Sequence, residues 1–93
     1  MSDTVVGNPQ AIREFASALQ QFCHQTRESL NGVRSHLSEL GHGEWSDSRY
    51  HQYSELFESS AAKISHALDE IEPEHLNILH NLANRLEEIL GGH

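Results

Sequence analysis

The chain has 93 residues, of which 37% are apolar, and this size predicts one small domain. Six Lys and Arg stand against fourteen Asp and Glu, so the formal charge is −8, and the basic residues are scattered through the sequence. A negative chain without a basic cluster argues against a nucleic-acid partner and against an anionic membrane surface.

The sequence contains no recognisable targeting or membrane-spanning segment. No window approaches the roughly 18 apolar residues of a spanning helix, and the first residues lack the basic segment and apolar core of a cleavable signal peptide. We therefore expect no membrane insertion and a cytoplasmic location, with any secretion following a route that needs no signal peptide.

The first predicted element is a helix over residues 8–40, preceded by a flexible arm over residues 1–7. Asn8 can cap the free backbone N–H groups of the helix, and Pro9 at the first helical position loses no hydrogen bond. Gly41 predicts the helix end, because glycine is favoured in the left-handed conformation just past a helix. Apolar residues recur with the period of an amphipathic helix, interrupted at Thr26: Ile12, Phe15, Leu19, Phe22, Leu30, Val33, Leu37 and Leu40.

A turn is predicted over residues 41–47 and a second helix over residues 48–90, capped by Ser46, Asp47 or Ser48. Pro73 interrupts this helix, because proline removes one backbone hydrogen bond and crowds the preceding turn. Two outcomes stay open, a kink near residue 73 or a third helix that begins with Pro73 in its first turn. The apolar positions are Tyr50, Tyr53, Phe57, Ala61, Ile64, Leu68 and Ile71, then Leu76, Leu79, Leu82 or Ala83, Leu86, Ile89 and Leu90.

Two long amphipathic helices joined by a short turn predict an all-α fold, an antiparallel helical hairpin. A single hairpin covers only part of each apolar stripe, and a chain of this size has little core volume. We therefore expect another chain to cover the rest, most simply through two hairpins that form a four-helix bundle. The residues expected to pack within or between hairpins are Phe15, Leu19, Phe22, Leu37, Phe57, Ile64, Leu68 and Leu86.

This arrangement resembles the WXG-type family of small helical hairpins with the ESAT-like fold, which is associated with type VII secretion. The resemblance is carried by the chain length, by the helix–turn–helix pattern from about Asn8 to Leu90, and by a lone Trp45 in the turn before an aromatic-bearing helix. It implies a bacterial protein that pairs with itself or with a related hairpin, as a secretion substrate or as the helical partner or chaperone of a larger effector. It also implies that the turn residues Trp45, Ser46 and Asp47 contact a partner chain or a secretion ATPase.

The sequence departs from the family pattern in two places. The family has Trp-x-Gly where this chain has Trp45-Ser46-Asp47, and Asp can replace Gly as a cap or in a turn. The C-terminal Tyr-x-x-x-acid export signal is missing, because no tyrosine follows Tyr53 and neither Tyr50 nor Tyr53 has an acid at the required spacing. A partner would therefore have to supply the signal, or this chain would serve as an adaptor.

Trp45 has two possible roles. As a hydrophobic plug it would close the end of the hairpin, which is the favoured interpretation. As an exposed anchor it would bind a partner, since tryptophan is enriched at interface hot spots. A different function also stays open, in which a cytoplasmic acidic immunity or regulatory protein uses its charge of −8 to mask a basic partner.

One metal-like pattern occurs, a Glu-x-x-His over residues 72–75, which is the spacing used in di-iron carboxylate bundles. Those sites need two such motifs and two further inward glutamates, whereas this chain has one copy. Zinc normally takes four ligands including water, and the remaining acid–histidine pairs offer two each. They are Asp47 with His51 and His66 with Glu70. We interpret these residues as solvated charges and expect no metal.

Catalysis is poorly supported by the sequence. The single Cys23 excludes an internal disulfide and adjoins the apolar stripe, which favours a small packed thiol. Its neighbour His24 points about 100° away on a helix, so the two do not form a nucleophile and base. No glycine-rich phosphate loop, Gly-x-Ser-x-Gly or His-Glu-x-x-His sequence is present. We expect a protein that is not an enzyme and that uses no cofactor.

Overall fold

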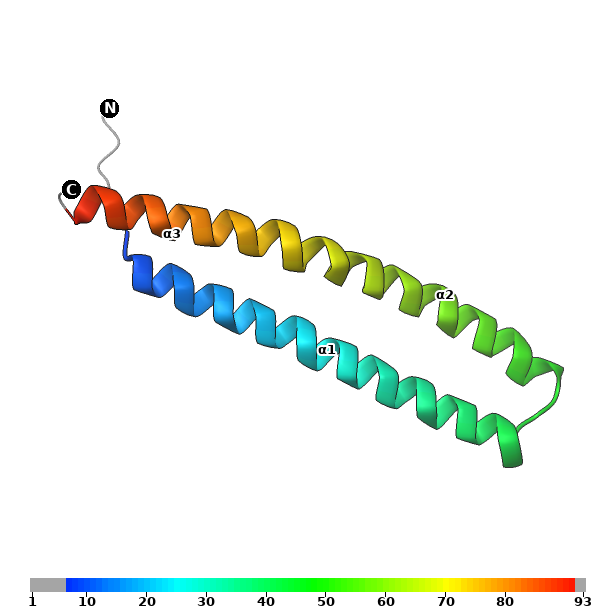
Figure 1. The fold of residues 1–93 in the computed structure, drawn as a ribbon. Helices are drawn as coiled ribbons and strands as arrows, with labels where there is room; N and C mark the ends of the chain where they lie inside the picture. Colours follow the sequence, from blue (N-terminus) through cyan, green and yellow to red (C-terminus); the bar gives the residue numbers. More distant parts are fainter. Residues whose placement is uncertain (1–6, 92–93) are drawn as a thin grey trace.

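A computed structural model describes residues 7–91 as an all-α antiparallel hairpin (Figure 1), which confirms the predicted fold class. The first arm is α1 (Pro9–Gly43), and the second arm consists of α2 (Ser48–Glu70), the π-helical turn η1 (Ile71–His75) and α3 (Leu76–Leu90). The molecule is a rod with principal extents of 66 × 22 × 18 Å. Of the arm predicted over residues 1–7, all but Gly7 lies outside the described residues.

The start of α1 agrees with the sequence prediction. The side-chain oxygen of Asn8 accepts hydrogen bonds from the backbone N–H groups of Gln10, at 2.9 Å, and Ala11, at 3.4 Å. Pro9 occupies the first helical position. These contacts satisfy donors that the first turn of a helix otherwise leaves without partners.

The end of α1 corrects the prediction, because the helix continues through Gly41 to Gly43 instead of ending at residue 40. The carbonyl oxygen of Leu40 accepts hydrogen bonds from the backbone N–H groups of Glu44, at 3.1 Å, and Trp45, at 2.9 Å. Glycine adopts the right-handed helical conformation as well as the left-handed one, so a glycine alone does not force a helix to stop. The turn is therefore shorter than predicted and covers residues 44–47.

Asp47 is the residue that caps α2. Its carboxylate accepts hydrogen bonds from the backbone N–H groups of Arg49, at 2.9 Å, and Tyr50, at 3.2 Å. A negative side chain at a helix N-terminus is also favoured by the helix dipole. Asp47 stands where the WXG-type pattern has glycine, and Asp caps a helix better than Gly does.

The region around Pro73 agrees with the first of the two predicted outcomes, a second arm that is irregular but joined near residue 73, and no helix begins with Pro73 in its first turn, because α3 begins at Leu76. The second arm continues through it (Figure 1), and the backbone widens into the π-helical turn η1. Inward positions are seven residues apart from Ala61 to Leu68 and from Leu76 to Ala83, but eight apart from Leu68 to Leu76. A π turn holds one residue more than an α turn, so η1 absorbs the additional residue and keeps the inward line on one side of the arm.

Small side chains form most of the buried core between the two arms. α1 packs more extensively against α3 than against α2. Because an alanine or cysteine side chain fills little space, the helix axes can approach closely along this line. The buried residues are Ala16 and Cys23 of α1, Ala61 and Leu68 of α2, and Ala83 of α3.

In the first half of α1 the packing line lies one residue away from the predicted Phe15 and Phe22, whereas further along it follows the predicted Leu30 and Leu37, which are half-buried. Phe15 and Phe22 are 58% and 54% exposed, whereas the next residues, Ala16 and Cys23, are buried. The narrow space between the arms accepts the small side chains and leaves the two aromatic rings outside. The fully buried free thiol of Cys23 confirms its interpretation as a small packed residue.

Candidate interaction surface

One flank of the hairpin is closed by ion pairs. The Arg13 guanidinium donates to both carboxylate oxygens of Glu87, at 2.8 and 2.9 Å, and to Asn84 at 2.7 Å. Arg34 Nε donates to Glu58 at 2.9 Å, and Glu58 raises the pKa of Arg34 through this hydrogen bond and its negative charge. We name as the charged flank all three α1 arginines and the acids they contact: Arg13, Arg27, Arg34, Glu58, Asp69, Glu72 and Glu87.

The charged flank fixes how the two arms lie against each other. Arg13, Arg27 and Arg34 are separated by multiples of seven residues, so they form one column along α1. The column is rotated by about 60° from the buried line that contains Ala16. Exposed ion pairs contribute only about 0–1 kcal/mol each, but forked arginine–carboxylate contacts are geometrically specific. The contact between Arg13 and Glu87 therefore fixes how the two arms are aligned along the rod.

The opposite flank carries large apolar side chains that the hairpin leaves exposed. Phe15 precedes Ala16 by one residue, which turns its side chain by about 100° to the side away from the arginine column. The exposed fractions along this side lie between 42% and 58%. We name as the apolar flank Phe15, Phe22 and Val33 of α1, Tyr53 and Ile64 of α2, and Leu82 and Ile89 of α3.

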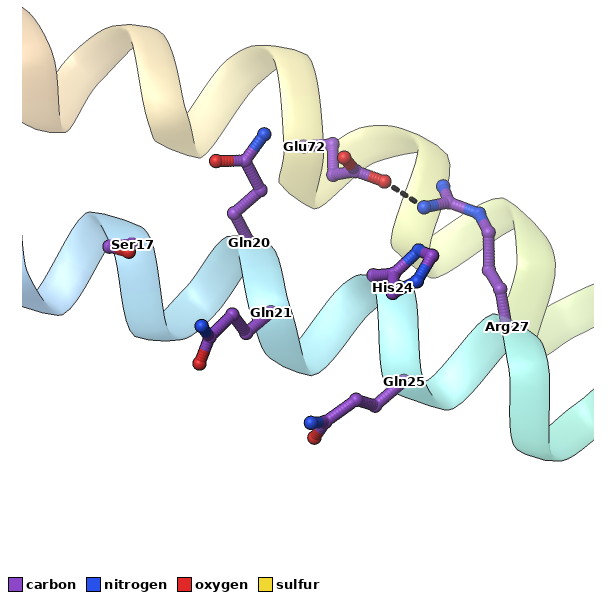
Figure 2. Close-up of a pocket in the computed structure, with 7 residues that line it drawn as sticks. All are labelled: Ser17, Gln20, Gln21, His24, Gln25, Arg27 and Glu72. Carbon is purple, nitrogen blue, oxygen red and sulfur yellow. Dashed lines mark hydrogen bonds and ion pairs between the residues drawn. The ribbon is translucent and has the colours of Figure 1, made fainter.

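A groove lies on each flank. The groove on the charged side has a volume of about 550 Å³, and Figure 2 shows Arg27 reaching from α1 to Glu72 while Gln21 and Gln25 point away from the second arm. The groove on the apolar side has a volume of about 250 Å³, lies between α1 and α2, and is lined by Thr26, Ser29, Leu30, Val33, Phe57 and Ile64. Apolar grooves of this kind accept side chains of a partner.

Trp45 belongs to an aromatic cluster that closes the turn. Its ring meets Tyr50 edge-on with the ring centroids 5.6 Å apart, and it stacks on Tyr53 at 6.4 Å. Tyr50 Oη donates a hydrogen bond to the backbone oxygen of Leu37 at 3.0 Å, which ties α2 to α1. Trp45 is half-buried, so part of this residue packs within the cluster at the end of the hairpin and part stays accessible.

The ring of Tyr50 lies directly over Gly41. A Cβ atom at Gly41 would overlap Cζ and Oη of Tyr50 and would lie 2.6 Å from Cε2. We expect Gly41→Ala to displace the ring, to break its hydrogen bond to Leu37 and to lower the free energy of unfolding by about 1–3 kcal/mol. Urea denaturation followed by circular dichroism measures this change.

Gly32→Ala is the matched control for Gly41→Ala. A Cβ atom at Gly32 would have nothing within 4 Å, and alanine is more favourable than glycine inside a helix. This variant should therefore be more stable by about 0.5–1 kcal/mol. Equal stability changes in both variants would contradict the close approach of Tyr50 to Gly41.

The predicted packing residues separate into three groups. Leu68 is buried in the hairpin. Phe15, Phe22 and Ile64 are exposed on the apolar flank, and for them packing between hairpins stays a prediction. The half-buried members are Leu19, Leu37, Phe57 and Leu86.

Sequence reasoning missed the charged flank and several members of the apolar flank. The spacing of Arg13, Arg27 and Arg34 by multiples of seven was a signal for the first, because residues so spaced share one side of a helix. Leu82 and Ile89 are also seven apart. Of the predicted turn residues, Ser46 is exposed and Asp47 serves as the helix cap.

The predicted charge pairs are not gathered into a metal site. Within residues 7–91, no group of three or more His, Cys, Asp and Glu side chains is placed to hold a metal ion. The carboxylate of Glu72, from the Glu-x-x-His pattern, contacts Arg27. A different acid–histidine pair, His24 with Glu28, lies on the surface of α1 with 3.3 Å between the ring nitrogen and the carboxylate.

Two results concern the chain as a whole. None of the helices within residues 7–91 is long and apolar enough to cross a bilayer. No protein-family model, curated protein or solved structure matches the chain. The geometry of the two flanks and of the turn therefore carries the functional argument.

Proposed function

We propose that this chain is a non-enzymatic protein-interaction module that pairs with a second helical hairpin, its own copy or a related one, through the apolar flank. The observation that carries the proposal is the difference between the two flanks. Arginine–acid contacts close the charged flank, whereas Phe15, Phe22 and Ile89 are each more than half exposed on the other. Contiguous exposed apolar surface of this kind marks protein–protein contact sites.

Helix patterning supports the same proposal. α1 presents apolar residues in three adjacent columns, which pass through Cys23, Leu19 and Phe22. Three apolar columns are the pattern of a helix that faces the core of a multi-helix bundle, whereas a two-stranded contact needs only two. A second hairpin packed on the apolar flank would complete a four-helix bundle.

The oligomeric state tests the proposal directly. Light scattering of the purified chain at micromolar concentration should give twice the chain mass of 10.5 kDa. In a second experiment the chain is mixed with a related hairpin from the same organism. A chain that stays monomeric in both experiments at concentrations up to about 100 μM would contradict the proposal, because its binding free energy would then be weaker than about −5.5 kcal/mol.

The resemblance to the WXG-type hairpins supports a more specific role, as a type VII-like secretion substrate or as the helical partner of a larger effector. Its support is the position of Trp45, which is half-buried in the turn and leaves an accessible part for a partner or a secretion ATPase. The test is the amount of the chain in the culture medium of strains with and without the secretion ATPase, and equal amounts would contradict the role.

A second candidate function rests on charge. The charged flank holds all three α1 arginines, which leaves Arg49, Lys63 and Arg85 as the described cations outside it against a larger number of exposed acids. Such a surface suits an immunity or regulatory protein that covers a basic partner.

Salt separates the two candidates. Two copies with a charge of −8 each repel, and salt screens that repulsion, so pairing through the apolar flank should stay equally tight or become tighter between about 50 and 500 mM NaCl. A complex held by masking of a basic surface should weaken at least about tenfold over the same range. Analytical ultracentrifugation at both salt concentrations gives the dissociation constants, and a pairing that dissolves in salt would favour the masking function.

A further inference from the structure

The apolar flank is not uniform along the rod. The outward column of α1 has large apolar residues in the half far from the turn and polar residues in the half near it: Phe15, Phe22, Ser29 and His36. The second arm has a weaker gradient, because Tyr53 lies in the same column at the end near the turn. Leu82 and Ile89 lie far from the turn, level with Phe15 because Arg13 contacts Glu87, and Ser60 and Ala67 lie nearer to it. In these two columns the half far from the turn therefore carries more of the large apolar residues, while Val33 and Ile64 of the apolar flank lie in the half near the turn.

Two copies that pair through the same flank are related by a two-fold axis, and this leaves two arrangements. With the axis along the rod, both turns lie at the same end, and α1 of each copy packs against the second arm of the other. With the axis across the rod, the turns lie at opposite ends, and α1 packs against α1. The two arrangements place different residues in contact.

The apolar gradient favours the turns at the same end. In that arrangement Phe15 and Phe22 of one copy lie level with Leu82 and Ile89 of the second copy, so large apolar residues meet each other. With the turns at opposite ends and the rods fully overlapping, the α1 column would meet its own reverse, and Phe15 would lie near His36 of the second copy. The second-arm column would also meet its own reverse, with Tyr53 near Ile89 and Leu82 near Ser60. An aromatic ring against a polar side chain buries apolar surface less favourably.

Charge favours the same arrangement. Glu39 on α1 and Arg49 on α2 are both exposed near the turn, and neither has an ion-pair partner within the described hairpin. Turns at the same end bring Glu39 of one copy near Arg49 of the other. Packing of α1 on α1 offers no free cation, because all its arginines belong to the charged flank, and it brings Glu39 of one copy toward Glu14 of the other.

We propose that the apolar flank binds a second copy of this chain with both turns at the same end of the bundle, so that α1 of each copy packs against α2 and α3 of the other. This inference rests on the proposed pairing function and adds its partner and its orientation. It places the two Trp45 clusters side by side, where one larger partner can contact both.

Distance measurement between two turns tests the orientation. A spin label is attached to Ser46→Cys, in the exposed turn, in a Cys23→Ala background whose helicity is checked by circular dichroism. We expect a label separation of about 20–30 Å, which is two to three helix spacings, in a sample that light scattering shows to be dimeric. A separation close to the rod length of 66 Å in a dimeric sample would overturn the orientation and leave the pairing intact. A monomeric sample would overturn both proposals.

Charge reversal gives a second readout. Glu39→Lys or Arg49→Glu alone should raise the dissociation constant of the dimer about threefold to tenfold at low salt, and the double reversal should restore it to within about twofold. Glu55→Lys is the matched control, because it makes the same charge change on an exposed residue away from the apolar flank. Equal effects of Glu39→Lys and Glu55→Lys, with no restoration by the double reversal, would overturn the same-end arrangement.

Discussion

Replacing Phe15 and Phe22 together with serine should convert the paired protein into folded monomers. Both rings are more than half exposed in the hairpin, so their loss should lower the stability of an isolated hairpin by about 1 kcal/mol or less per site. In a symmetric dimer four rings are lost, and burial of the exposed half of each contributes about 1 kcal/mol. The dissociation constant should therefore rise about a thousandfold.

The matched control for this double variant lies on the other side of α1. Gln20→Ser with Gln21→Ser shortens two exposed side chains of the same helix next to the charged groove and should leave the dimer intact. Sedimentation over a range of concentrations measures pairing, and circular dichroism reports whether both variants stay helical. A phenylalanine variant that remains as tightly paired as the control would show that the apolar flank is not the interface.

Local chemistry made the helix starts and the hairpin predictable. Asn8 before Pro9 and Asp47 before α2 are capping residues whose contacts involve only the next few residues, so the sequence contains the whole signal. The two amphipathic helices and the short turn between them led to the antiparallel hairpin for the same reason. At the end of α1 the prediction was wrong, because Gly41 serves a contact with Tyr50, nine residues further along the chain.

The identity of the buried residues could not be read from hydrophobicity alone. Phe15 and Ala16 both continue an apolar stripe, and the choice between them depends on how closely the arms approach. That distance depends jointly on Cys23, Ala61 and Ala83, which lie on three different helices. The apolar periodicity of any one helix therefore does not predict it. The effect of Pro73 likewise depended on the inward spacing of the whole second arm, since η1 absorbs one residue that the heptad pattern alone left unexplained.

Enlarging a buried alanine between the arms should destabilise the hairpin more than a surface change does. Ala61 is 1% exposed, and Ala61→Leu adds three carbon atoms to a site that α1 already fills. Overpacking of this kind costs about 1–3 kcal/mol, and for a domain of this length each kcal/mol lowers the melting temperature by about 4–8 °C. Thermal denaturation at one fixed protein concentration measures the loss.

Ala62→Leu is the matched control, because the adjacent alanine is exposed and leucine is also a good helix former, so its melting temperature should stay within a few degrees of the original. Equal tolerance of leucine at both positions would mean that the arms do not approach at Ala61. The comparison also bears on pairing. A core of three alanines, one cysteine and one leucine buries little apolar surface, so a large part of the stability should come from the second hairpin. The melting temperature of the unmodified chain should therefore rise with its concentration by mass action.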